Sequence, residues 1–408
     1  MTRPLRKTEP APDAFAIPLQ ARTPDDWLAI TRLLAADFAS HAAERERSKA
    51  SPLPQLDQIR ASGLSVLMIP KENGGGGADW PLATRIIHDL AAADGSLGVL
   101  FAYHSFNSVH LRRLSPERRS AAEREVAAKR LWLSGIANPR DGEISIAPVE
   151  GGFLLNGRKS FCTGALFADR LSVSGRRTDT GDIVRVLLPT DRTGIAYGND
   201  WDSLGLQRTE SGSFTLSDVR IAADEISAVR PNDETDHAAS IHVPVNQSAF
   251  TAFYLGFARG AVDAARDYVQ QHGRPWDGAA RSQTEEPLIL VQFGQAWSAY
   301  RAALALAERA AESVQELIAA GPRFTARQRG DTAIEVAAAK TQAIKVSLEV
   351  TAAIFDIMGA RATGNRWAFD RFWRDARTHS LHDPLAYKLK EVGDFVLNGR
   401  HPPVGPYT

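Results

Sequence analysis

Two histidines and an aspartate stand close together in the segment THSLHDP, residues 378–384. His379 and His382 are three residues apart, so both can face the same side of a helix. Imidazole donates and accepts hydrogen bonds and changes its charge near neutral pH, which suits acid–base or hydrogen-bonding catalysis. The alternative is an ordinary helix end, with one histidine capping carbonyl groups and the other in solvent. A metal site with Asp383 as third ligand is disfavoured, because no further His or Cys is placed to complete it.

Other patterns exclude several classes of chemistry. Cys162 is the single cysteine, so no internal disulfide can form, and we interpret its side chain as core packing. The four glycines at 74–77 are not followed by Gly-Lys-Ser/Thr, so they do not form a phosphate-binding loop. No Gly-x-Ser-x-Gly occurs, and serine hydrolase chemistry therefore lacks support.

The elements that must position these residues fall into three regions of different periodicity. Apolar spacing is helical from Thr23 to about Lys129, alternates with period two from Leu131 to about Ile226, and is helical again from Asp236. We predict an α+β protein with an N-terminal helical domain (1–130), a central antiparallel β domain that forms a small barrel or sandwich (131–235), and a C-terminal four-helix bundle (236–408).

The bulk composition limits the partners. Lys+Arg and Asp+Glu are both 48, so the net charge is zero, which argues against nucleic acid or an anionic membrane as the main partner. No apolar stretch is long enough to span a bilayer, and the first residues carry charges and prolines where an export signal needs an apolar run. We predict a cytoplasmic enzyme of a reducing compartment.

Helices, then strands, then a helical bundle is the order of the acyl-CoA dehydrogenase superfamily, and local motifs agree with it. The chain resembles that family in IPKENGGGGADW (69–80), GGFLLNGRKSFCTGA (151–165), SGSFTLSDVRIAADEI (211–226), LGFARGAVDAARDYV (255–269) and FDIMGARAT (355–363). A narrower resemblance is to its dibenzothiophene monooxygenase branch, in AAADGSLGVLFAYHSFN (91–107), DWDSLGLQRTESGS (200–213), RPWDGA (274–279) and FDRFWRDARTHSLHDPLAYKL (369–389).

The resemblance gives the histidine segment a meaning. Acyl-CoA dehydrogenases place a glutamate base after Arg-Asp-Ala, whereas here Asp383 falls on that position and His382 on the preceding tyrosine. Aspartate is one methylene shorter, and Pro384 biases it away from helical geometry, so dehydrogenation is disfavoured. A histidine suits oxygen chemistry, because a flavin peroxide needs a dry pocket and a hydrogen-bond donor. We predict His382 as that donor, Asp383 as its orienting group and His379 as a further catalytic candidate.

A third histidine, His104, follows an Ala-rich helical run, where a lone histidine is commonly a satisfied core residue. The resemblance places it beside the substrate pocket, so we predict it as a second hydrogen-bonding group. Its neighbour Tyr103 is predicted to be core packing.

The resemblance also implies a flavin site. Phe161, Thr163 and Gly164 would lie against the flavin, with Thr163 hydrogen-bonding its ring and Gly164 permitting close approach. Thr209 and Ser211 would offer short donors to a phosphate or a ring edge, with an ordinary turn as the alternative.

Two further positions complete the predicted cofactor site. Arg274 corresponds to the arginine that in this superfamily reaches a neighbouring subunit's cofactor phosphate, with a plain surface arginine as the alternative. Trp201 would pack beside the cofactor or in the core. A shared phosphate site predicts a homo-oligomer, a tetramer built as a dimer of dimers.

The predicted function is that of a two-component monooxygenase, in which a separate NAD(P)H:flavin reductase supplies reduced FMN and O2 oxygenates the sulfur of a small organic substrate. The dibenzothiophene enzymes have Asn where this chain has Ile136, which puts the same substrate in doubt. Three alternatives remain: a nitroalkane-oxidase-like enzyme that uses Asp383 as base and retains FAD, a true acyl-CoA dehydrogenase, and a catalytically silent scaffold.

Overall fold

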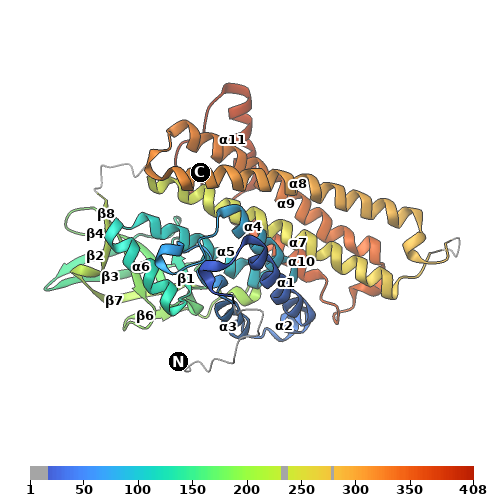
Figure 1. Cartoon of the computed structure of the whole chain (residues 1–408), viewed down its shortest axis with the longest axis horizontal. Helices are drawn as coiled ribbons and strands as arrows, with labels where there is room; N and C mark the ends of the chain where they lie inside the picture. The colour runs from blue at the N-terminus through green and yellow to red at the C-terminus, as the bar shows by residue number, and fades with distance from the viewer. Residues whose placement is uncertain (1–16, 231–237, 277–279) are drawn as a thin grey trace.

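A mixed sheet stands at one end of the molecule, and long helices run away from it toward the other end (Figure 1). The computed structural model describes residues 17–230, 238–276 and 280–408. The N-terminal helices are α1 Pro24–Ser40, α2 Ala42–Ser48, α3 Leu53–Ser62, α4 Trp80–Ala93, α5 Gly95–His110 and α6 Pro116–Lys129. The strands are β1 Leu133–Ile136, β2 Ile144–Val149, β3 Gly152–Lys159, β4 Arg170–Arg177, β5 Ile183–Pro189, β6 Ile195–Tyr197, β7 Phe214–Ala222 and β8 Ile226–Arg230. The C-terminal helices are α7 His242–His272, α8 Pro287–Ala320, α9 Ala326–Met358, α10 Asp370–His379 and α11 Leu385–Asn398.

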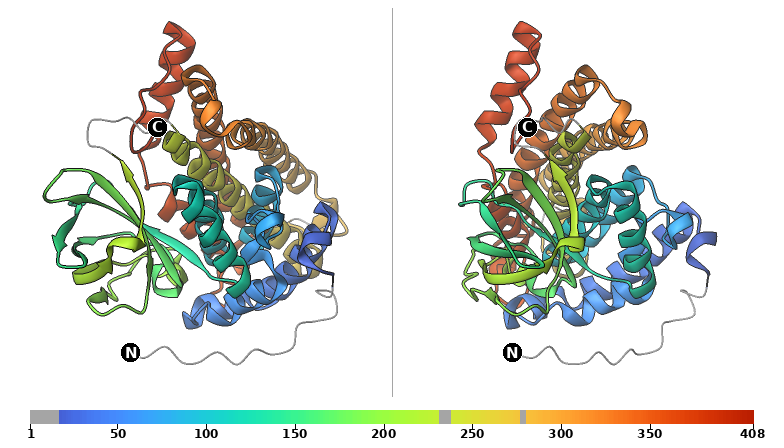
Figure 2. Two further views of the ribbon diagram at one scale, coloured as in Figure 1. Left: turned by 60° about the vertical axis from the view of Figure 1, so that its left-hand side comes forward. Right: turned by 90° about the vertical axis from the view of Figure 1, so that its left-hand side faces the viewer.

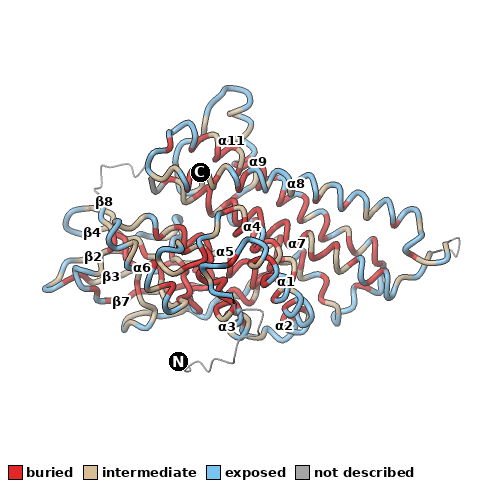
Figure 3. Tube along the Cα trace, in the orientation of Figure 1, coloured by how far each residue is buried: buried red, intermediate tan, exposed pale blue. Residues whose placement is uncertain are grey.

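Side-chain caps define where α1 and α5 begin. Thr23 forms a capping box with Asp26 at the start of α1, and Asp94 caps α5 by accepting the amide of Leu97. The residues of α5 are buried almost throughout, because this helix lies between the sheet and α7 (Figure 3). Side chains on one side of α5 therefore face the sheet, and those on another side face α7.

The sheet has the order β6-β7-β3-β2-β4-β5-β8, and β1 pairs with β4 beside this path. A two-residue turn, Glu150–Gly151, joins β2 to β3, with Gly151 at φ 76°. The predicted β domain is present, but it is not wholly antiparallel: β4 runs parallel to both β1 and β2. Parallel neighbours need a crossover connection, and such long-range pairing leaves no signal in the alternation of a single strand.

The C-terminal region is built on three long helices, α7, α8 and α9, with α10 and α11 packed against α9 (Figure 2). Close packing of α7 on α4 depends on two glycines. A Cβ atom on Gly256 would lie 2.5 Å from the carbonyl oxygen of His88, and one on Gly260 would lie 2.2 Å from that of Ala92. The predicted boundary at 130/131 lies between α6 and β1, and the one at 235/236 lies outside the described residues.

Several apolar side chains are exposed on α8 and α11. The end of α11, which stands away from the body of the molecule in Figures 1 and 2, exposes Val396 and Leu397 at 78% and 82%. The start of α8 exposes Leu288, Leu290 and Val291. In the described part of the chain, no helix combines the length and apolar character that crossing a membrane would require.

Candidate active site

The loop after β3 presents an aromatic ring outward. Phe161 has a positive φ of 55°, and its side chain is exposed although it is large and apolar (67%). Its ring meets that of Trp201 edge-on, with 6.2 Å between centroids, and the Trp201 indole N–H donates to the carbonyl of Leu206 over 3.0 Å. A non-glycine residue at positive φ with an exposed aromatic ring is an arrangement that favours a ligand-binding loop.

A chain of hydroxyl groups runs behind this loop. Ser211 donates to the Thr163 hydroxyl over 2.9 Å and lies 2.8 Å from the Thr209 hydroxyl, which in turn donates to the carbonyl of Leu206. Gly164 has φ 70°, and a Cβ on it would lie 2.8 Å from Leu100, so glycine allows the close approach here. The structure therefore brings Thr163, Gly164, Thr209 and Ser211 together with Phe161 and Trp201. Their binding of a flavin stays a prediction.

The two histidines of the THSLHDP segment, His379 and His382, stack on each other at the end of α10. The rings of His379 and His382 are 3° from parallel with 5.3 Å between centroids, and Phe250 of α7 packs edge-on against both. His379 lies between two tyrosine hydroxyls, 2.7 Å from Tyr254 and 3.4 Å from Tyr103. Burial, followed by the nearby His382 and Lys340, lowers the pKa of His379 well below its ordinary value, so this ring is neutral.

Asp383 does not stand free. Its Oδ1 accepts from the ammonium group of Lys340 and lies 3.2 Å from Nδ1 of His382, while Oδ2 is buried with no hydrogen-bond partner among the described residues. Burial alone would raise the pKa of Asp383, but the His382 hydrogen bond and the Lys340 charge outweigh it and lower the pKa below its ordinary value. Asp383 is therefore a carboxylate held between two donors.

Three residues of this cluster were not predicted as part of the site. Tyr103 packs against the core, as predicted, but its hydroxyl also reaches His379 and interacts with the Thr163 hydroxyl, so it links the histidines to the loop after β3. Burial is the first cause that raises the pKa of Tyr103 to about 12, and the phenol stays protonated. Lys340 and Tyr254 gave no signal, because a single polar residue in a long amphipathic helix is ordinarily on the solvated face.

His104 lies in the core and away from that cluster. Its Nδ1 accepts the amide of Leu133 over 2.9 Å, its Nε2 is 2.6 Å from the carbonyl of Ser65, and its ring stacks on Trp132 at 4.4 Å. Burial lowers the pKa of His104 to about 4. Both ring nitrogens are occupied by backbone groups, so this geometry argues against the predicted catalytic role, and we do not retain His104 in the site.

Arg274 lies on the surface just after α7, where its backbone amide donates to Gln283 over 3.0 Å. The structure does not bring it to the loop residues of the same chain. Its predicted role in a neighbouring subunit's cofactor site stays a prediction.

The C-terminal tail returns to the histidines. The carbonyl of Tyr407 accepts from Gln247 over 2.8 Å and from Lys388, and the Tyr407 ring lies edge-on to His382 at 6.1 Å between centroids. The side chain of His382 is 36% exposed. Tyr407 thus lies against one side of His382, which is partly exposed.

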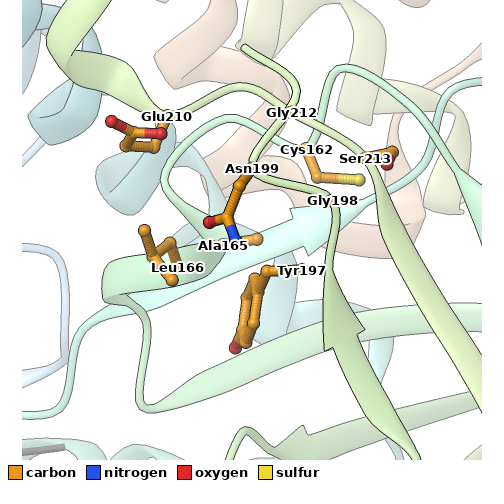
Figure 4. A pocket seen from close by; sticks show the side chains of 9 residues that line it. All are labelled: Cys162, Ala165, Leu166, Tyr197, Gly198, Asn199, Glu210, Gly212 and Ser213. Atoms are coloured by element: carbon orange, nitrogen blue, oxygen red, sulfur yellow. The ribbon is translucent and has the colours of Figure 1, made fainter. Parts of the chain in front are cut away.

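The side chain of Cys162, between Phe161 and Thr163 in the loop after β3, is buried and packs in the core. Burial is the main cause that raises the pKa of its thiol to about 12. Together with Tyr197, Asn199 and Glu210 it lines a surface hollow on the sheet side of the loop (Figure 4). Among the described residues, no group of three or more His, Cys, Asp or Glu side chains is placed to hold a metal ion.

A buried carboxyl group joins the two walls of the site. Asp375 of α10 accepts the amide of Leu206 on Oδ1 over 2.6 Å, and a Cβ on Gly205 would lie 2.2 Å from the carbonyl carbon of Arg374. Burial, then the negative charge of Glu46, raises the pKa of Asp375 from its ordinary 3.8 to about 8. This contact fixes the loop before Thr209 on the helix that ends in His379.

The raised pKa of Asp375 predicts a pH effect on stability. Between about pH 4 and pH 8 the folded protein holds a proton that the unfolded chain has lost, so stability falls as pH rises through this range. Asp375→Asn keeps an acceptor for Leu206 and cannot ionise, so its advantage over the wild type should grow from pH 5 to pH 8. Urea unfolding followed by circular dichroism at both pH values measures this difference, and parallel pH dependences would contradict it.

Comparison with known proteins places the chain in a family. The model for the acyl-CoA dehydrogenase N-terminal domain matches residues 28–119, and that for the acyl-CoA dehydrogenase C-terminal domain matches residues 248–386. A dibenzothiophene monooxygenase of Rhodococcus qingshengii is 37% identical over 93% of this chain and 94% of its own. A probable FMNH2-dependent monooxygenase of Pseudomonas putida is 34% identical over 94% of this chain and 98% of its own.

Solved structures of monooxygenases are similar to this chain in fold and sequence. An FMN-bound enzyme of Paenibacillus sp. A11-2, also solved as a dibenzothiophene monooxygenase, is 38% identical and covers 93% of this chain and 99% of its own, with a TM-score of 0.89. Methanesulfinate monooxygenase of Pseudomonas fluorescens is 34% identical with the same coverages and a TM-score of 0.88.

Proposed function

Because this chain belongs to the acyl-CoA dehydrogenase superfamily and is an FMN-dependent monooxygenase within it, we propose that it oxygenates the sulfur of a small organosulfur compound in a two-component system. The substrate class includes sulfides, sulfoxides, sulfones, sulfinates and thiophenes. O2 is the second substrate, and a separate NAD(P)H:flavin reductase delivers reduced FMN by transient contact. We also propose a cytoplasmic location, where NAD(P)H is available to that reductase.

The residues around the loop after β3 fit FMN. Phe161 offers an exposed aromatic ring, and Gly164 permits close approach. The buried hydroxyls of Thr163, Ser211 and Thr209 hydrogen-bond to one another and would support the loop from behind. When bound, reduced FMN supplies the electrons that activate O2. The protein residues then have to hold the flavin, exclude water and direct a proton.

The observation that carries the proposal is the way in which Asp383 is held. A carboxylate that removes a proton from carbon must be free to accept it and must have a matched pKa. Asp383 instead shares Oδ1 between Lys340 and His382, and its pKa is lowered, which opposes a role as base. His382, partly exposed and oriented by Asp383, is the group free to donate a hydrogen bond to an oxygen species, as an oxygenase requires.

The proposal is tested by supplying the purified protein with FMN, NADH and a flavin reductase under 18O2, with methanesulfinate and dibenzothiophene as separate substrates. Incorporation of one labelled oxygen atom into a product supports it. Catalase is included, and reactions lacking only this protein serve as controls, because peroxide released from free flavin oxidises sulfur unaided. Tight stoichiometric FAD with nitroalkane oxidation, or enoyl-CoA formed from acyl-CoA without labelled sulfur products, would contradict the proposal.

Arg274 provides a prediction about assembly. Its exposed position after α7 and the exposed apolar residues of α8 and α11 support a homo-oligomer, which we propose to be a tetramer, with Arg274 contacting the flavin phosphate of a neighbouring subunit. Loss of one charge-assisted hydrogen bond should weaken FMN binding about tenfold in Arg274→Ala. Titration calorimetry measures the affinity, and Arg118→Ala, at an exposed position on α6, is the matched control.

Light scattering and thermal unfolding complete that experiment. Arg274→Ala should keep the wild-type mass and melting temperature, since its guanidinium makes no hydrogen bond or ion pair with the residues that the structure describes. A fully active monomer would exclude the shared site. Equal FMN affinity in the Arg274 and Arg118 variants would remove Arg274 from the cofactor site.

A further inference from the structure

A buried lysine contacts the THSLHDP segment from α9. Lys340 of α9 is 1% exposed, and its ammonium group donates to Asp383, which is 5% exposed. The ammonium also lies 5.7 Å from the ring centroid of Phe250. Removing an ammonium ion from water is costly unless it is paired, so Lys340 needs its carboxylate partner.

The geometry of the pair differs from that of an ion pair built only for stability. Lys340 and His382 both contact the same oxygen, Oδ1, whereas Oδ2 is buried without a hydrogen-bond partner among the described residues. A buried acceptor left unsatisfied weakens the fold, and apolar side chains of similar volume commonly replace a buried ion pair without loss of stability. The arrangement therefore serves the group that shares Oδ1, which is His382.

We propose that Lys340 is a positioning residue: its ammonium group fixes the carboxylate of Asp383 so that Oδ1 accepts the Nδ1 proton of His382, which leaves Nε2 as the ring nitrogen available to a ligand. Nε2 accepts a hydrogen bond in the neutral ring and donates one when the ring is protonated, with Asp383 as its counter-charge. The stacking of His382 on His379 and the edge contact with Phe250 fix the plane of the same ring. The placement of the Nδ1 proton depends only on this chain. Its consequence in turnover rests on the proposed function.

Charged and titratable groups surround the two stacked histidines from several elements. His379 on α10, Asp383 in the following turn and Tyr407 in the tail contact the His382 ring. Tyr103 on α5 and Tyr254 on α7 contact His379, and Lys340 on α9 contacts Asp383, with Lys388 and Glu391 on α11 acting on Lys340. Among the described residues, only Asp383 hydrogen-bonds to the His382 ring, so the tautomer reports on the state of this carboxylate.

The test is the tautomer of His382 in flavin-free protein, read from ring nitrogen shifts by magic-angle-spinning NMR of histidine-labelled, sedimented samples. The His382 signal is assigned by its loss in His382→Gln. Neutral His382 should carry its proton on Nδ1 in the wild type, in Lys340→Arg, which keeps the charge, and in Lys345→Met, an exposed lysine on the same helix. Lys340→Met should shift the proton to Nε2, because burial favours a protonated Asp383 that donates to Nδ1.

A Lys340→Met protein that keeps the Nδ1 proton overturns the inference. If that variant does not fold, Lys340→Met/Asp383→Asn removes both charges together, and its His382 tautomer should equal that of Asp383→Asn alone. A difference between those two proteins also overturns it, since Lys340 would then act without Asp383.

Turnover separates this inference from the proposed function. Product per reduced FMN should fall about tenfold in Lys340→Met, recover in Lys340→Arg, and fall no further when Lys340→Met is added to Asp383→Asn. If the tautomer shifts but product yield stays at the wild-type value, the proposed role of His382 in oxygenation fails and the assignment of Lys340 stands.

Discussion

His382→Ala should bind FMN as the wild type does and consume O2, yet form about 100-fold less oxygenated product for each reduced flavin. Removing one preorganised donor from a reacting oxygen typically raises the barrier by about 3 kcal/mol. The electrons would then leave as hydrogen peroxide. Product and peroxide are measured together against NAD(P)H oxidised, and His41→Ala, an exposed histidine at the end of α1, is the control.

The ranking of His382 against Asp383 decides between oxygenase and carboxylate-base chemistry. Asp383→Asn keeps the volume and should reduce coupled product less than His382→Ala, because the amide still occupies the space beside Lys340. Asp383→Ala is a poorer probe, since it leaves a buried ammonium group without its anion and lowers stability on that account. If Asp383→Asn abolishes turnover while His382→Ala stays coupled, Asp383 is a base and our assignment is wrong.

The second large effect is expected at Asp94. This buried carboxylate pairs with Arg45 over 3.0 Å and with Arg208, and it also caps α5. Asp94→Ala should lower the free energy of unfolding by about 3–5 kcal/mol, because it leaves two buried guanidinium groups without this anion. Urea unfolding measures the loss, and Asp57→Ala, which removes a half-exposed carboxylate, should cost less than about 1 kcal/mol.

The pH dependence gives Asp94 a separate signature. Burial would raise its pKa, but Arg208 and Arg45 outweigh burial and lower it. A carboxyl group whose folded pKa is depressed stabilises the protein above its unfolded pKa, and this contribution is lost as pH falls through the folded pKa. Asp94→Ala should therefore lose less stability on acidification than the wild type. Equal losses of unfolding free energy in Asp94→Ala and Asp57→Ala would show that the ion pairs of Asp94 with Arg45 and Arg208 contribute little.

The pattern of apolar residues by itself determined the division into helices, strands and helices. The spacing that distinguishes a helix from a strand repeats within a few consecutive residues, so it can be read without knowing the tertiary contacts. Local motifs also determined the two halves of the site. The loop with Phe161, Thr163 and Gly164 and the segment with His379 and His382 are each continuous in sequence, and each keeps its residues together in the structure.

Only the tertiary structure decided what those segments meet. Lys340 lies 43 residues before Asp383, and nothing in its helix distinguishes a lysine that pairs inside the bundle from one in solvent. The packing of α5 turned the hydroxyl of Tyr103 toward His379 and the ring of the next residue, His104, toward Ser65 and Leu133, a difference that two neighbouring positions in a helical pattern do not reveal. The parallel pairing of β4 with β1 and β2 likewise joins distant segments. Such contacts depend on which faces meet across the core, and a periodicity specifies a buried face without specifying its partner.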